Sequence, residues 1–309
     1  MTLVVGQRFG DRITLLSDTM ISDSQTGRDS IVPGRLKSVV LSSMMSVGYA
    51  GFANQCVDAI RQAFRMIQEG CDKAAVLDHF IKVSASEPRQ PSNDYIIASH
   101  YDGAELFLIK ERKLSKVSGP VFVGSPTAFD KVMDSMNQST RSSIDYVSNE
   151  ELRLANGFTN QFIGTTAVDD GVGGVPISLL GSPYGHTYNN YACASNSDTI
   201  IIGSGPGTGR TSEHERRAIT GETEWRFNVN GPKCRGVPLA GLYCDQIRTG
   251  FIYMPIQFDE AVSVGDIGMT EFFSGLDRLG QRMFDSPMYL FDQRTRNGPA
   301  QRWVLESFH

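Results

Sequence analysis

Apolar and β-branched residues at the start of the sequence predict a β-hairpin. Residues 2–9 (TLVVGQRF) and 12–16 (RITLL) have strand patterns, and Gly10 and Asp11 between them are turn formers. Two further short strands are expected at 36–41 and 45–50. The chain therefore opens with four strands before any helical pattern begins.

The hydrophobic period then changes to that of a helix. Apolar residues recur at helical spacing over 56–67 and stop at Gly70, and Asp72 is placed to cap a second helix ending near residue 81. Strands return at 95–100 and 104–110. These segments predict two helices followed by another hairpin.

A second pair of helices is expected further along. A strand at 121–123 leads to a helix that starts near Pro126, and Ser148 with Glu151 forms a capping-box pattern for the next helix. We expect the apolar face of that helix to be formed by three residues: Leu152, Ala155 and Phe162. A strand at 177–180 follows a Gly-rich turn.

This order of elements predicts an α+β fold for residues 2–190. Two antiparallel sheets between two pairs of helices, a four-layer αββα sandwich, would cover the apolar faces of both sheets. Residues 194–238 show few periodic runs, so residues 191–309 are assigned to a C-terminal extension. The segment 225–309 contains 13 of the 29 aromatic residues, which indicates packing on the core or a subunit contact surface.

Composition narrows the class of protein. The chain is 40% hydrophobic and 20% charged with a net charge of −5, which favours a globular protein and gives no reason to expect nucleic-acid binding. Its five scattered cysteines fit reduced thiols, and no apolar run is long enough to span a membrane. The sequence start lacks a signal-peptide pattern, so we expect a cytoplasmic protein. Neither a phosphate-loop GK[ST] nor a standard zinc pattern occurs, so no cofactor or metal is expected.

Four positions in the first fifty residues carry the most specific pattern. Thr2 opens the first strand, Asp18 follows the second in LLSDT, Lys37 lies in GRLKSVV, and Gly51 precedes a helix in GYAGFANQ. Their spacing resembles the proteasome β-subunit and HslV family of N-terminal-nucleophile hydrolases. The resemblance covers residues 2–190, with a longer stretch between Asp18 and Lys37.

The resemblance implies a threonine-type hydrolase of amide or peptide bonds. Thr2 would be the nucleophile after removal of Met1, Asp18 and Lys37 would support it, and Gly51 would supply an oxyanion N–H. It also implies two less closely matched site residues: Ser125 and Asp169. At the latter site, Val172 stands where the family often has serine. Homo-oligomerisation, a ring and an ATP-dependent unfoldase partner follow only from the family.

The chemistry needs the free α-amine of a first-residue threonine. A threonine hydroxyl is a poor nucleophile without a base, and an α-amine with a pKa near ~7.7–8 can serve as one. A nearby ammonium would keep that amine neutral by repulsion. Each position also has an ordinary structural explanation, since Asp18 could end a strand and Lys37 could be a solvated charge. A non-catalytic subunit on the same fold and a small-molecule amide hydrolase outside any ring are the two alternatives.

Overall fold

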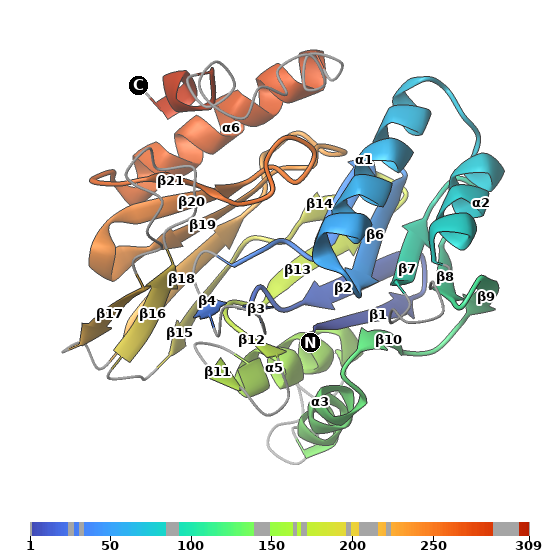
Figure 1. Ribbon diagram of the computed structural model, residues 1–309, viewed down its shortest axis with the longest axis horizontal. Helices are drawn as coiled ribbons and strands as arrows, with labels where there is room; N and C mark the ends of the chain where they lie inside the picture. The colour runs from blue at the N-terminus through green and yellow to red at the C-terminus, as the bar shows by residue number, and fades with distance from the viewer. Residues whose placement is uncertain are drawn as a thin grey trace.

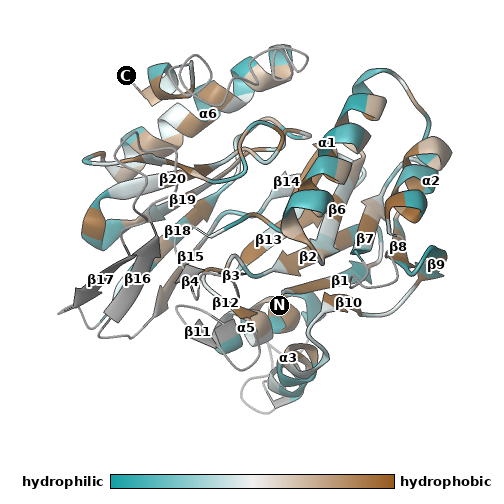
Figure 2. Ribbon diagram, viewed as in Figure 1, coloured by the Kyte–Doolittle hydropathy of each residue, from teal (hydrophilic) through white to brown (hydrophobic). Residues whose placement is uncertain are grey.

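The computed structural model describes residues 2–23, 28–30, 34–84, 93–138, 149–162, 166–167, 172–195, 199–203, 216–220, 224–286 and 303–308. Within these residues the chain is a mixed α/β structure whose strands form antiparallel sheets (Figure 1). In Figure 2 apolar residues colour much of β1, β2 and β13, whereas α1 alternates between polar and apolar residues. Burial of these strands provides the main favourable term in folding.

The first sheet is built around the N-terminal hairpin. Its strands lie in the order β10 (Val121–Gly124), β1 (Leu3–Phe9), β2 (Arg12–Ser17), β13 (Ile177–Gly181) and β14 (Thr187–Tyr188). The helices α3 (Pro126–Gln138) and α5 (Glu150–Phe162) pack against each other and against this sheet. Leu3, Val5 and Leu16 are buried in a cluster with residues of these two helices.

The second sheet lies against the first. Its strands are β5 (Ser38–Ser42), β6 (Met45–Ala50), β7 (Asp94–Ser99), β8 (Glu105–Lys110) and β9 (Lys113–Val117), in that order. The helices α1 (Ala53–Gln68) and α2 (Lys73–Val83) pack on it. The two sheets approach closely at Gly48, where a Cβ would lie 2.5 Å from Val4 Cγ1. Any larger residue at position 48 would require the Val4 side chain to move.

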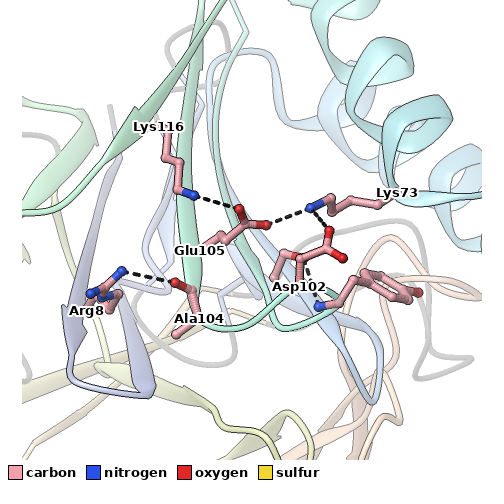
Figure 3. Close-up of polar contacts among 8 residues, drawn as sticks. Arg8, Lys73, Asp102, Ala104, Glu105 and Lys116 are labelled. Carbon is pink, nitrogen blue, oxygen red and sulfur yellow. Dashed lines mark hydrogen bonds and ion pairs between the residues drawn. The ribbon is translucent and has the colours of Figure 1, made fainter.

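A charged network fastens α2 to the second sheet (Figure 3). The Lys73 ammonium at the start of α2 pairs with Asp102 in the β7–β8 turn and lies 2.7 Å from Glu105 Oε2. Lys116 on β9 pairs with the other oxygen of Glu105 at 2.7 Å. On the neighbouring hairpin, Arg8 donates a hydrogen bond to the carbonyl of Ala104. The cluster joins one helix and three strands at the edge of the molecule.

The C-terminal part of the chain forms a third sheet with its own helix. The strands lie in the order β15 (Tyr191–Ser195), β18 (Trp225–Asn230), β19 (Ala240–Cys244), β20 (Thr249–Tyr253) and β21 (Val262–Val264). The helix α6 (Met269–Asp285) packs on it and on the 3₁₀ turn η4 (Glu306–Phe308). The buried residues of this region, Trp225 and Phe272 among them, belong to the same hydrophobic cluster as the second sheet.

Short elements complete the described chain. The two-stranded pairs are β3 (Ile21–Asp23) with β4 (Arg28–Ser30), β11 (Thr166–Ala167) with β12 (Val172–Gly173), and β16 (Thr199–Gly203) with β17 (Arg216–Thr220). A 3₁₀ turn, η3 (Asp245–Ile247), joins β19 to β20. Strands thus occupy part of the 194–238 region, where the sequence showed little periodicity.

The predicted hairpin, the two helices after residue 50 and the strand near 177 are confirmed, with boundaries shifted by a few residues. Asp72 caps α2 as expected, because its carboxylate accepts a hydrogen bond from the N–H of Ala75 at 2.8 Å. The N-cap residue of α1 is Phe52, whose side chain makes no capping hydrogen bond. The capping residue could therefore be predicted from the sequence for α2 but not for α1.

The predicted start of α5 is wrong, and its predicted apolar face is confirmed only in part. Ala155 packs against the buried cluster as expected, Leu152 does not, and the side chain of Phe162 lies outside what the structure describes. Asn149 caps this helix by accepting from the N–H of Leu152 at 3.1 Å, and Ser148 lies outside the described residues. Glu151 accepts a 2.6 Å hydrogen bond from Thr14 on β2. Leu152 is 51% exposed, while Leu154 and Phe158 are fully buried. The helix therefore turns Leu154, Ala155 and Phe158 inward, while Glu151 is bound to the sheet.

A buried relay of hydrogen bonds links the two sheets at the end of the hairpin remote from Thr2. The Asp11 carbonyl can only accept, so His100 Nε2 donates to it at 2.9 Å and leaves His100 Nδ1 as an acceptor. His186 Nε2 then donates to His100 at 2.8 Å, and Ser46 donates to His186 Nδ1 at 2.7 Å. In this assignment the donors run in one direction, from Ser46 to the Asp11 carbonyl.

We predict that acid weakens the fold through His186. Burial, and then the nearby His100, lowers the pKa of His186 to about 3, below the ~6.5 of an unfolded histidine. Between these two pH values the unfolded chain therefore binds a proton at this histidine and the folded chain does not. The contribution of neutral His186 to the free energy of unfolding is complete above pH ~6.5. It is lost towards pH ~3, by up to ~1.4 kcal/mol per pH unit.

Urea unfolding of wild type and His186→Gln between pH 7.5 and 5 measures this slope. The variant should be less stable at pH 7.5 but should lose less stability on acidification. His79→Gln on α2, outside the relay, is the matched control and should retain the steep slope. Equal slopes for wild type and His186→Gln would show that the relay does not govern the acid response.

Candidate functional site

Asp18 is the centre of the candidate site. It follows the last residue of β2 and is fully buried. Its Oδ1 accepts a hydrogen bond from the N–H of Leu3 at 3.0 Å, and its Oδ2 accepts one from the Lys37 ammonium at 2.6 Å. The N–H of Gly173 on β12 lies 3.5 Å from the same Oδ2. One carboxylate therefore joins the start of β1, the segment before β5 and β12.

Lys37 approaches Asp18 from the second sheet. It directly precedes β5, its side chain is only 6% exposed, and its carbonyl accepts from the N–H of Tyr49 on β6 at 3.1 Å. The backbone of Lys37 is thus held by β6 while its side chain crosses to the first sheet. The ion pair is a direct link between the two sheets.

The electrostatics of this pair are governed by burial. Burial raises the pKa of the Asp18 carboxyl, and the attraction of Lys37 together with the hydrogen bonds from Leu3 and Gly173 works against that rise. Burial likewise lowers the pKa of the Lys37 ammonium, while Asp18 opposes that change and Arg35 adds to it. Each charge is tolerated in the interior because the other is in contact with it.

The peptide bond between Thr2 and Leu3 is held on both sides. Its N–H, on Leu3, donates to Asp18, and its carbonyl, on Thr2, accepts from the N–H of Ser125 at 2.8 Å. Gly124 has a φ of +101°, and a Cβ there would lie 1.7 Å from the Thr2 carbonyl oxygen. Only glycine permits this approach. The main chain of half-buried Thr2 is therefore fixed next to the Asp18–Lys37 pair.

Ser125 lies beside Thr2 and also begins α3. Its buried hydroxyl accepts from the N–H of Ala128 at 3.2 Å, the geometry of an N-cap. The hydroxyl proton remains available as a donor. Asp169 lies outside the described residues. Val172 and Gly173, which follow that segment, form β12 close to Asp18.

Gly51 lies at the exit of β6, two residues after Tyr49. Its φ of +134° is in the region that favours glycine, and it is exposed directly before the N-cap of α1. The hydrogen bond between Tyr49 and Lys37 connects this turn to the ion pair. Hydrogen bonds thus join Asp18, Lys37, Ser125 and the peptide between Thr2 and Leu3, and Gly51 follows two residues after the Tyr49 that binds Lys37.

Thr19 is a supporting residue that the sequence did not single out. Its hydroxyl accepts from the N–H of Val175 at 2.9 Å, and its carbonyl accepts from the N–H of Arg35 at 2.7 Å. These bonds fasten the two segments that carry Gly173 and Lys37 onto the strand end that carries Asp18. The only sequence signal was its position directly after Asp18.

The C-terminal region reaches the edge of this site. Arg61 on α1 donates to the carbonyls of Pro255 and Ile256, and pairs with Asp259 at 2.9 Å. The segment so held borders a small hollow whose other walls come from α1 and from the residues preceding Lys37. The hollow is lined by Arg35, Leu36, Val57, Tyr253, Met254, Pro255, Phe258, Asp259, Glu260 and Ala261. The extension thus contributes a wall next to the segment that leads to Lys37.

Among the described residues, no three His, Cys, Asp or Glu side chains gather in a way that could hold a metal ion. All five cysteines are free. The described helices include none that is both long and apolar enough to cross a membrane.

Comparison with known proteins gives limited information. No protein-family model matches the sequence, and no curated protein matches it. Among solved structures, the chain is similar to eukaryotic HslV from Trypanosoma brucei, with a TM-score of 0.42 and 13% sequence identity. That similarity covers 58% of this chain and 98% of the HslV chain. A likeness of this degree does not establish a family for the chain.

We predict that loss of one partner of the buried pair strongly destabilises the fold. Lys37→Met would leave a buried carboxylate without its cation, at a cost of ~3–5 kcal/mol. Asp18→Asn in the same chain removes that unpaired charge, so the double variant should be less destabilised than the sum of the single variants. Urea unfolding of the four proteins gives the coupling energy.

A matched control exists on α2. Lys82 and Asp78 also form a Lys–Asp pair with an N–O distance of 2.6 Å, but their side chains are 73% and 57% exposed. Lys82→Met should cost no more than ~0.5 kcal/mol. Equal losses for Lys37→Met and Lys82→Met would contradict the importance assigned to burial.

Proposed function

We propose that this chain is a threonine-type amidohydrolase that cleaves peptide bonds with Thr2 as its nucleophile. The observation that carries the proposal is the buried Asp18–Lys37 pair, whose carboxylate also binds the N–H of Leu3. It supports the proposal because the carboxylate that holds the Lys37 ammonium also binds the peptide between Thr2 and Leu3. A structural ion pair would not need to bind that first peptide.

The proposed reaction requires removal of whatever precedes Thr2, so that its α-amine is free. With a pKa near ~7.7–8, that amine can take the proton of the Thr2 hydroxyl as the oxygen attacks the substrate carbonyl carbon. The tetrahedral intermediate collapses when the amine passes the proton to the leaving nitrogen. Water then attacks the resulting ester with the same amine as base, which releases the acid and restores Thr2.

Lys37 and Asp18 support this chemistry by charge. An ammonium near the α-amine disfavours a second positive charge and so keeps the amine as the free base. Asp18 holds the ammonium in place, and its bond to Leu3 keeps the strand start in register with it. The Gly51 N–H is the proposed donor to the oxyanion. Ser125 and Asp169 are proposed to complete the hydrogen-bond network around Thr2.

The wider arrangement is consistent with the N-terminal-nucleophile class. Two facing sheets with α1 and α2 on one and α3 and α5 on the other support a four-layer αββα sandwich for residues 2–190. We further propose that residues 191–309 form an extension packed on this unit and that the protein is a cytoplasmic homo-oligomer. A ring and an unfoldase partner extend this proposal, and native mass spectrometry of the purified protein tests the assembly.

Covalent labelling tests the proposed nucleophile. Full-length protein is treated with a β-lactone, whose carbonyl would be opened by the Thr2 oxygen to give an ester, and is then mapped by peptide mass spectrometry. We expect an adduct on Thr2 in the wild type, none in Thr2→Ala, and a restored adduct in Thr2→Ser. Lys37→Ala should slow labelling by about a hundredfold or more, in the range found for lost electrostatic catalysis.

The intact mass gives the outcome that would overturn the proposal. Labelling requires that Thr2 be the first residue of the purified chain. If Met1 is retained, or if the adduct forms at another residue and persists in Thr2→Ala, Thr2 is not the nucleophile. A non-catalytic subunit on the same fold would then be the better description.

A further inference from the structure

The start of α1 is capped by a residue from another element. Phe52 is its N-cap residue and has no side-chain oxygen to offer, in contrast to Asp72 at the start of α2. Asn93, which directly precedes β7, accepts a hydrogen bond from the N–H of Phe52 at 2.9 Å. It also donates to the side chain of Gln55 at 2.9 Å. Asn93 is 5% exposed, so its amide is committed to these contacts.

These bonds reproduce a capping box with one residue inserted. In an ordinary capping box the side chain at the third helical position accepts directly from the N–H of the N-cap residue. Here Gln55 is at that third position and Phe52 is the N-cap, and the Asn93 amide bridges the two. The first turn of α1 is therefore anchored to the start of β7.

The anchoring acts on both sides of Gly51. Ala50, before it, pairs with Asp94 in the ladder between β6 and β7. Phe52, after it, is bound by Asn93, the neighbour of Asp94 along the chain. Gly51, with its φ of +134°, is thus the single residue between two points fixed to the same strand. The direction of its N–H is set by those two points, because glycine itself imposes little restriction on φ.

We infer that Asn93 is a positioning residue that aims the Gly51 N–H at the reacting carbonyl oxygen. The inference rests on the proposed function, in which that N–H stabilises the oxyanion. Asn93 does not touch the reacting atoms and acts only through Phe52. Without it, the Gly51 turn samples other conformations, and a misplacement of about 1 Å can cost on the order of a hundredfold in rate.

The test compares two variants that each lose one helix cap. Asn93→Ala removes the cap of α1, and Asp72→Ala removes the cap of α2, which is also a single side-chain bond to a backbone N–H. Labelling of Thr2 by a β-lactone is followed with time over a range of concentrations, which separates the binding constant KI from the rate constant of acylation. Melting temperatures are measured in parallel.

We expect both variants to melt at lower temperature, and only Asn93→Ala to acylate more slowly, by about ten- to a hundredfold with KI little changed. A merely structural cap would lower the melting temperature and leave acylation unaffected, as expected for Asp72→Ala. Equal acylation rates in Asn93→Ala and Asp72→Ala would overturn the positioning role.

Hydrogen exchange of residues 50–55 separates this inference from the proposed function. Asn93→Ala should accelerate exchange in this segment whether or not Thr2 reacts, and unchanged exchange would refute the anchoring by Asn93. An absence of Thr2 labelling in the wild type would instead overturn the proposed function and, with it, the catalytic purpose assigned to Asn93. Slower acylation of Thr2 together with faster hydrogen exchange in Asn93→Ala would support both the proposed function and the positioning role of Asn93.

Discussion

The buried pair of Asp18 and Lys37 is the contact on which the arrangement of the site depends. Asp18 belongs to the first sheet and Lys37 leads into the second, so their contact fixes one sheet relative to the other. Two buried charges bring a large desolvation cost, which close contact and further hydrogen bonds must offset. The N–H groups of Leu3 and Gly173 supply those further bonds on the carboxylate. An apolar pair could fill the same space, but it could not hold the first peptide of β1.

The two sheets are joined by different kinds of polar contact at the two ends of the N-terminal hairpin. Near Thr2 the sheets are joined by a charged pair, whereas at the Gly10–Asp11 turn they are joined by neutral imidazoles donating in one direction. The charged link also binds the N–H of Leu3, directly after half-buried Thr2. The histidine link is fully buried at Ser46 and His186 and reaches the exposed turn at Asp11.

The sequence was informative where structure is local and less so where distant contacts decide. The 12–16 and 45–50 strands and the Asp72 cap follow from neighbouring residues, and the structure contains all three. The face of α5 was predicted only in part: Ala155 packs inward, but Leu152 is exposed, and Glu151 accepts a hydrogen bond from Thr14, far away in the chain. The strands between 191 and 230 had weak periodicity because each gains its stability from pairing with other strands of the C-terminal region.

In the candidate site, too, some residues could be predicted from the sequence and others depend on distant contacts. Asp18 and Lys37 were selected by the resemblance of four spaced residues to a known family, and they are in contact. Asn93 carried no signal, because an asparagine before a strand is common and its effect is exerted on a helix start about forty residues earlier. The wall formed by Pro255 and Asp259 could not be foreseen either, since only folding brings it to Arg61. Sequence patterns thus identify groups with a chemical reason for their spacing, while the residues that aim those groups are defined by tertiary packing. The precision of such a site is therefore a property of the whole fold, including its C-terminal third.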